Sequence, residues 1–142
     1  MSNLSTLFDR YKALVVFDTE TSGLDFDNDR IIELAALRVE RTATGGLRIA
    51  GKMDTFIKLP EGETLPENIV SLTGITDERL QTEGVQPAKA ASQIAKLMQN
   101  GPTLMIAHNA QFDACFLRGL LRGQKVGRID WLDSLTVYKD CL

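Results

Sequence analysis

The stretch Ala13-Leu14-Val15-Val16-Phe17-Asp18-Thr19-Glu20-Thr21 begins with five apolar residues in a row. Two of them are β-branched, and a short continuous apolar run of this kind predicts a buried strand. Thr21-Ser22-Gly23 then predicts a turn. We therefore expect a strand over 13–18 that carries acidic side chains out of the protein interior.

Working outward, the apolar periodicity predicts further elements on both sides of this strand. The short connection 41–46 between two long strands predicts an antiparallel hairpin, and a helix between the last two strands predicts a right-handed parallel crossover. Together they indicate an α/β protein with a mixed five-stranded sheet flanked by helices. The other strands are expected at 31–40, 47–58, 103–107 and 129–133, and the helices within 1–12, at 66–72, from Thr76, at 87–99, at 110–122 and from 134 to 142.

Length and composition limit what the chain can be. Its 142 residues predict one domain, 1–142, large enough to bury a core. With only two cysteines, a disulfide framework is not expected, and Cys115 and Cys141 are expected to be buried thiols. No apolar run approaches the ~20 residues of a membrane span, and no signal peptide is visible, so we expect a cytoplasmic protein without a membrane partner. The net charge of −3 does not advertise a nucleic-acid binder, but bound divalent metals would reverse the local sign.

Asp18 and Glu20 are the first residues that suggest chemistry. Because side chains alternate along a strand, both acids point to the same face. Two neighbouring carboxylates repel each other unless a charge offsets them, and Mg²⁺ or Mn²⁺ prefers carboxylate oxygens. For an isolated Asp-x-Glu, a solvated strand end is the more common explanation.

A second candidate segment runs from His108 to Asp113. Asn109 is suited to cap the following helix, and Asp113 falls in its first turn, where the helix dipole favours negative charge. His108 is the single histidine of the chain, and a structural role suits it as well as a chemical one. If the two strands are neighbours, Asp18, Glu20 and Asp113 converge at the carboxyl ends of the strands, where α/β proteins usually bind ligands.

The two segments together resemble the first and second motifs of the DEDD 3′–5′ exonuclease superfamily. The first is Val16-Phe17-Asp18-Thr19-Glu20-Thr21-Ser22-Gly23-Leu24, and the second is His108-Asn109-Ala110-Gln111-Phe112-Asp113. The pattern is most similar to the proofreading exonucleases of bacterial DNA polymerase III, of the epsilon and PolC types. Leu72-Thr73-Gly74-Ile75-Thr76-Asp77 is similar to a connecting motif of that group. The resemblance implies a ribonuclease H-like fold.

The resemblance also implies a role for each matching residue. Asp18, Glu20 and Asp113 are implied to be catalytic and to be three of four metal-binding carboxylates for two Mg²⁺ or Mn²⁺ ions. His108 is implied to support the second motif without acting as the general base. The implied contacts to the terminal nucleotide and its pocket come from Thr19, Thr21, Gly23, Leu24, Thr73, Gly74, Ile75, Asn109 and Phe112.

The chain departs from the family at the third motif. In the family this motif supplies the fourth carboxylate and a general-base histidine in a His-x-x-x-x-Asp pattern, but no histidine follows His108. The tyrosine variant fails as well, because Leu142 stands four residues after Tyr138. Asp130-Trp131-Leu132-Asp133-Ser134 resembles the family segment between the second and third motifs. We therefore expect a chain that lacks the third motif and has little activity by itself.

The expected function follows from the resemblance. It is metal-dependent removal of nucleoside 5′-monophosphates from single-stranded DNA 3′ ends, in replication proofreading or repair, and a DNA polymerase subunit is one candidate partner. Two other functions stay open at this level. One is a module that binds a nucleic-acid end without cleaving it, and the other is a relative that trims RNA.

Overall fold

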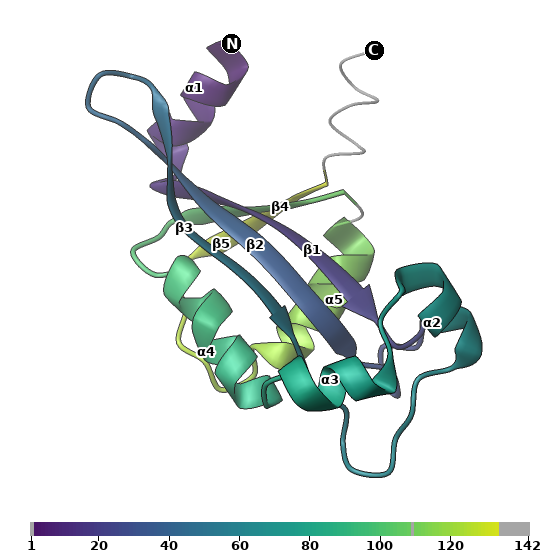
Figure 1. Ribbon diagram of the computed structural model, residues 1–142. Coiled ribbons are helices and arrows are strands. Elements are labelled where there is room, and N and C mark those ends of the chain that lie inside the picture. Colours follow the sequence, from purple (N-terminus) through teal and green to yellow (C-terminus); the bar gives the residue numbers. More distant parts are fainter. Residues whose placement is uncertain (1, 109, 134–142) are drawn as a thin grey trace.

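The computed structural model describes residues 2–108 and 110–133 and shows a five-stranded mixed sheet with helices on both faces (Figure 1). The strands lie in the order β3-β2-β1-β4-β5. β1 pairs antiparallel with β2 and parallel with β4, so that it lies in the middle of the sheet. The strands are β1 (Ala13–Thr21), β2 (Ile31–Arg41), β3 (Leu47–Phe56), β4 (Thr103–Ala107) and β5 (Ile129–Asp133).

The helices are α1 (Ser2–Arg10), α2 (Glu67–Thr73), α3 (Asp77–Glu83), α4 (Pro87–Leu97) and α5 (Ala110–Leu120). α4 and α5 cover the sheet face that carries Val15 and Phe17, and the main core lies between them. α1 covers part of the opposite face, where Phe8 and Tyr11 pack on Leu14. Burial of the apolar alternate residues on both faces accounts for the continuous apolar run in β1.

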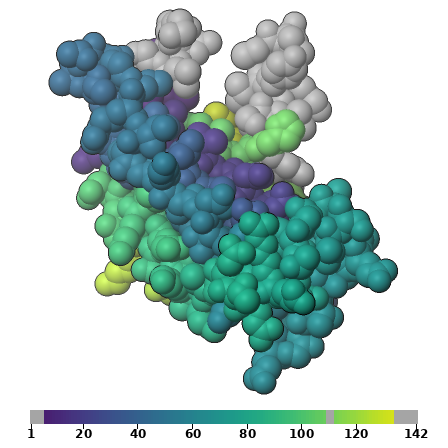
Figure 2. All heavy atoms as spheres, viewed as in Figure 1, coloured from purple at the N-terminus to yellow at the C-terminus, as the bar shows by residue number. Residues whose placement is uncertain are grey.

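α2 and α3 form a separate layer at one end of the sheet. They pack on Ile32, close to where β1 ends, through Ile69, Ile75 and Leu80. The hydroxyl of Thr76 accepts a hydrogen bond from the backbone N–H of Arg79 at 3.1 Å, which confirms the predicted N-cap. Figure 2 shows the teal atoms of this part of the chain as a lobe at one end of the molecule.

Several boundaries differ from those that the sequence predicts. β1 continues to Thr21 instead of ending at 18, because β2 pairs with it as far as Ile31, so Asp18 and Glu20 lie within the strand. The third strand ends at Phe56, the helix from Pro87 at Leu97 and the helix from Ala110 at Leu120. The helix expected over 134–142 lies outside the described residues.

Cys115 is exposed and not buried as expected, because its neighbours Ala114, Phe116 and Leu117 are the α5 residues that face the core. Cys141 lies outside the described residues. Within the described part of the chain, no helix is long and apolar enough to cross a membrane.

Candidate metal centre

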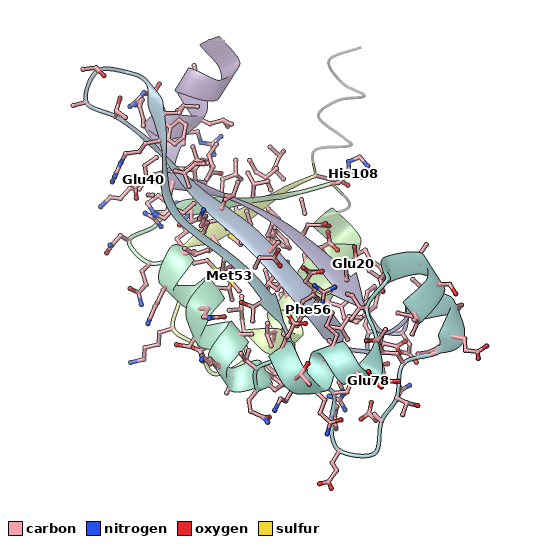
Figure 3. All side chains as sticks on the ribbon, viewed as in Figure 1. Glu20, Glu40, Met53, Phe56, Glu78 and His108 are labelled. Atoms are coloured by element: carbon pink, nitrogen blue, oxygen red, sulfur yellow. The ribbon has the colours of Figure 1, made fainter. Side chains whose placement is uncertain are left out.

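β1 presents Asp18 and Glu20 on the sheet face opposite the main core. Phe17 and Thr19 alternate with them and point toward α4 and α5. Asp18 is exposed and Glu20 is half-buried, with Glu33 of β2 directly across from it. Figure 3 shows Glu20 near the end of β1. Both carboxylates therefore lie near the C-terminal end of β1, where water and a ligand can reach them.

Asp113 reaches the same edge from the other side of the sheet. β4 runs parallel to β1 and ends at Ala107, and after the exposed His108 the chain enters α5, with Asp113 in its first turn. Asp113 is buried, with 6% of its surface exposed. The hydroxyl of Thr19 donates a hydrogen bond of 2.7 Å to its Oδ1. The first and second motifs are thus joined directly, 94 residues apart in sequence.

Burial and the charges of neighbouring acids influence the pKa values of Glu20 and Asp113. Burial raises the pKa of Glu20 above its ordinary value, and the charges of Asp18 and Asp113 raise it further. Burial also raises the pKa of Asp113, with the charges of Asp18 and Asp133 acting in the same direction. The hydrogen bond from Thr19 and the charge of His108 lower the pKa of Asp113 but do not cancel these effects. A positive ion beside these groups would relieve this repulsion.

The donor chemistry of these residues fits a hard divalent cation. Ionised carboxylates supply the oxygen ligands that Mg²⁺ and Mn²⁺ prefer. None of the ion pairs between described residues involves Asp18, Glu20 or Asp113, so no lysine or arginine neutralises them. As the side chains lie, however, no three His, Cys, Asp or Glu groups among the described residues surround a common point. The fold brings the acids close enough for their charges to influence one another, but the described side chains do not form a complete set of metal ligands.

Two further acids lie near this centre, and neither was predicted from the sequence to be a site residue. Asp133 is the last residue of β5. Its charge adds to burial in raising the pKa of Asp113. Glu33 faces Glu20 across the β1–β2 pair, and its pKa is raised to about 7. The position of Asp133 at the end of a predicted strand was one available signal. For Glu33 the signal was an acid inside the apolar run 31–37.

Gly23 and Leu24, two of the residues expected to contact a terminal nucleotide, lie in the loop that follows β1. The hydroxyl of Thr21 donates to the carbonyl oxygen of Gly23 at 2.7 Å, which holds the start of the loop. A side chain at Gly23 would collide with the carboxylate of Asp29 and force that carboxylate to move. Leu24 follows with 80% of its surface exposed. The loop therefore presents an apolar side chain to solvent.

The connecting motif lies at the end of α2, which Figure 1 shows beside the end of β1. The hydroxyl of Thr73 donates to the carbonyl oxygen of Ile69 at 2.8 Å and accepts from the N–H of Ile75 at 3.1 Å. Gly74 ends the helix in the left-handed region, at φ 76°. Ile75 is 3% exposed and packs in the core under α2 and α3. The structure thus shows these residues shaping the turn.

Two residues of the second motif remain. Phe112 is partly buried and packs against the main core, with its ring centroid 5.5 Å from that of the half-exposed Phe26. It packs against Phe116, with ring centroids 5.0 Å apart. Asn109, the expected helix cap, lies outside the described residues.

Comparison with known proteins places these motifs in context. The RNase T family model, described as an exonuclease, matches residues 15–140. The PolC-type DNA polymerase III of Bacillus subtilis is 37% identical over 108 residues, covering 72% of this chain and 6% of that protein. The enzyme of the same name from Oceanobacillus iheyensis is 33% identical over 133 residues, covering 90% of this chain and 8% of that protein. The chain therefore spans less than a tenth of the length of these relatives.

Solved structures support the same fold. Exonuclease I of E. coli in complex with a dT13 oligonucleotide matches with a TM-score of 0.76 and 21% identity, covering 92% of this chain and 29% of that one. A zinc-bound form of the same enzyme with single-stranded DNA also has a TM-score of 0.76, with 22% identity. The five-stranded mixed sheet flanked by helices is the ribonuclease H-like fold of these exonucleases.

Proposed function

This chain belongs to the DEDD exonuclease family, and on that premise we propose that it carries most of the active site of a metal-dependent 3′–5′ exonuclease acting on single-stranded DNA. The observation that supports this best is the meeting of the two motifs at the sheet edge. The hydrogen bond from Thr19 to Asp113 joins them, and burial, together with the charges of neighbouring acids, raises the pKa of both Glu20 and Asp113.

In this proposal Asp18, Glu20 and Asp113 hold the metal. When bound, two divalent ions supply the activation of water and the stabilisation of charge on the leaving oxygen. The protein contributes orientation, because Thr19 fixes one oxygen of Asp113 at 2.7 Å and leaves the other available. Burial of Asp113 and Glu20 raises the free energy of their charged forms, which favours neutralisation by a cation.

The loop after β1 would receive the 3′ end. Leu24 follows β1 in this loop and is exposed, so its side chain can contact the terminal base or its neighbour. Thr21 and Gly23 hold the loop, and the turn at Thr73 and Gly74 lies at the end of α2 next to β1. An apolar wedge beside a metal centre separates the last nucleotide from the strand, and this arrangement suits removal of one nucleoside 5′-monophosphate at a time.

The proton of the attacking water needs an acceptor. A histidine with pKa near 6.5 serves this purpose in many hydrolases, but His108 is the only histidine and belongs to the second motif. We propose that the general base and the fourth carboxylate come from a third motif outside residues 1–142. A role in replication proofreading or repair, in association with a polymerase, is proposed from the likeness to PolC-type enzymes.

A second function is favoured by the unfinished acid cluster. Without the third motif and without a ready-made cage among the described residues, the chain could bind a strand end and one ion without cleaving. An exonuclease and an end-binding module predict different products from the same experiment.

The experiment incubates a single-stranded DNA, labelled at its 5′ end, with Mn²⁺ and either residues 1–142 or a longer chain that includes a His-x-x-x-x-Asp segment. Removal from the 3′ end yields a descending ladder. We expect the ladder from the longer chain and little or none from residues 1–142, since general-base assistance alone contributes about 10²–10⁴-fold. An RNA of the same sequence tests the preference between the two substrates.

Asp18→Asn and Asp113→Asn in the longer chain should each abolish the ladder, whereas Asp9→Asn, at an exposed aspartate of α1, should preserve it. Equal ladders from both chains would show that residues 1–142 contain a complete site. No ladder from the longer chain would rule out the exonuclease.

A further inference from the structure

A cavity of about 430 Å³ is lined in part by the loop that follows β1. Its walls come from that loop, from the start of α4 and from the outer surface of α5. The volume is within the ~300–1,000 Å³ of small-molecule sites. None of the candidate metal ligands lines it, so the cavity is separate from the metal centre.

Three cationic side chains line this cavity: Arg30, Lys58 and Arg122. Lys58 and Arg122 take part in none of the ion pairs between described residues. Arg30 makes one long contact of 3.4 Å to Glu63, in which both side chains are about half exposed. Such a contact contributes little. The chain as a whole carries a net charge of −3, whereas three cations gather around this cavity.

Two aspartates also line the cavity. The carboxylate of Asp29 is directed into its own loop, where it accepts from the hydroxyl of Ser22 at 3.1 Å and from the N–H of Asp25 at 2.9 Å. Asp27 is exposed to solvent. The three cations outnumber the two acids. The carboxylate of Asp29 is already hydrogen-bonded within its own loop.

The start of α4 adds further positive character. Pro87 and Ala88 line the cavity at the N-terminus of this 11-residue helix, and no side chain of Gln86 caps it. The partial positive charge of a helix N-terminus favours anions, above all beside cationic side chains. With the three cations, this end of α4 makes the floor of the cavity suited to a phosphate group.

The rim of the cavity is aromatic. Phe26 is 51% exposed, and its ring is held at one side by Phe116 at 5.1 Å and by Phe112 at 5.5 Å. Because two aromatic rings hold Phe26 in place while half of its surface stays exposed, it offers a stacking surface to a base. Aromatic surface and cations around one cavity of this size match a nucleotide better than a peptide or a simple anion.

We propose that this cavity binds a nucleoside 5′-monophosphate, with the phosphate near Lys58 and Arg122 and the base on Phe26. The identification of this ligand with the reaction product rests on the proposed function, because an exonuclease releases nucleoside 5′-monophosphates beside this loop. Phe26 and Arg30 belong to the same loop as Leu24. A product bound in the cavity would therefore contact the loop that is proposed to receive the 3′ end.

The test uses residues 1–142 in EDTA, which removes metal-dependent binding, and measures affinity for thymidine 5′-monophosphate by calorimetry or ¹H–¹⁵N NMR. Loss of one charged hydrogen bond corresponds to about tenfold or more in affinity. We therefore expect Lys58→Ala/Arg122→Ala to weaken binding by at least tenfold. Arg48→Ala/Arg128→Ala removes two exposed cations outside the cavity and should leave it unchanged.

Three further ligands test the identity of the nucleotide. Thymidine and inorganic phosphate should each bind more weakly than the monophosphate, and Phe26→Ala should weaken the monophosphate without affecting phosphate. An oligothymidine without a terminal phosphate should also bind more weakly. Equal affinity for phosphate and monophosphate, equal affinity for the oligothymidine, or equal affinity of the two double variants would each overturn the proposal.

Asp18→Asn separates this inference from the proposed function. It removes a metal ligand but no cavity residue, so monophosphate binding in EDTA should persist at wild-type affinity. Binding that disappears in Asp18→Asn would assign the nucleotide to the metal centre and overturn the cavity site. The ladder assay reports on the nuclease independently, because it requires metal and the third motif.

Discussion

Glu33→Gln is the change whose effect can be worked out most fully from the structure. Glu33 faces Glu20 across the β1–β2 pair and is hydrogen-bonded to Asp54. Burial, this hydrogen bond and the charges of Asp54 and Glu20 raise its pKa from 4.5 to about 7, although the charge of Arg79 opposes them. Glutamine keeps a hydrogen-bond donor for Asp54 and has no charge at any pH.

The sign of the pH effect follows from this raised pKa. Below pH 4.5, Glu33 is protonated in both the folded and the unfolded chain and costs nothing. Between about pH 4.5 and 7 the unfolded chain releases the proton first, so the free energy of unfolding falls as pH rises. The difference of about 2.5 in pKa sets an upper limit of about 3.4 kcal/mol. Because Glu33 is only partly buried, solvent screening reduces this to about 1 kcal/mol.

Glu33→Gln should therefore be more stable than wild type by about 1 kcal/mol at pH 8 and equal to it near pH 4.5. Urea unfolding in EDTA at intervals between pH 4.5 and 8 measures this difference, and contributions of other acids largely cancel in it. Glu61→Gln, in an exposed loop, is the matched control and should show no trend with pH. A difference between Glu33→Gln and wild type that is the same at pH 5 and pH 8 would refute the reasoning.

Three other predictions can be checked by standard methods. Asp18→Ala/Asp113→Ala should abolish Mn²⁺ binding in titration calorimetry, where wild type should bind one ion weakly; unchanged binding would remove both residues from the metal centre. Phe112→Ala should lower the free energy of unfolding by about 2–3 kcal/mol, less than the ~3–5 kcal/mol of a fully buried aromatic, because Phe112 is only partly buried; a urea midpoint like wild type would contradict this. Arg38→Met should lower the free energy of unfolding by about 2–4 kcal/mol, because the buried guanidinium donates to the carbonyl oxygens of Leu97 and Gln99 at 2.7 Å. A decrease below about 1 kcal/mol in the same assay would show that these carbonyl oxygens find other partners.

The sequence alone determined the parts of the protein that depend on local pattern. Residues 103–107 and 129–133 predicted β4 and β5 with their observed bounds. The first segment is mostly apolar and buried, as expected for a strand covered on both faces. Thr76 predicted the start of α3, since its hydroxyl can satisfy a free N–H at a helix end. The spacing of Asp18 and Glu20 and the His108–Asp113 segment pointed to the family, whose model matches residues 15–140.

Only the tertiary structure decided which distant side chains meet. The hydrogen bond between Thr19 and Asp113, the raised pKa of Glu33 and the cluster of Lys58 with Arg122 each join residues from different elements. Exposure was also decided at this level, because Cys115 lies on an apolar helix and is nevertheless exposed. A periodic pattern states that one face of an element is buried, but the burial, charge and partners of a particular side chain depend on the elements that pack against it.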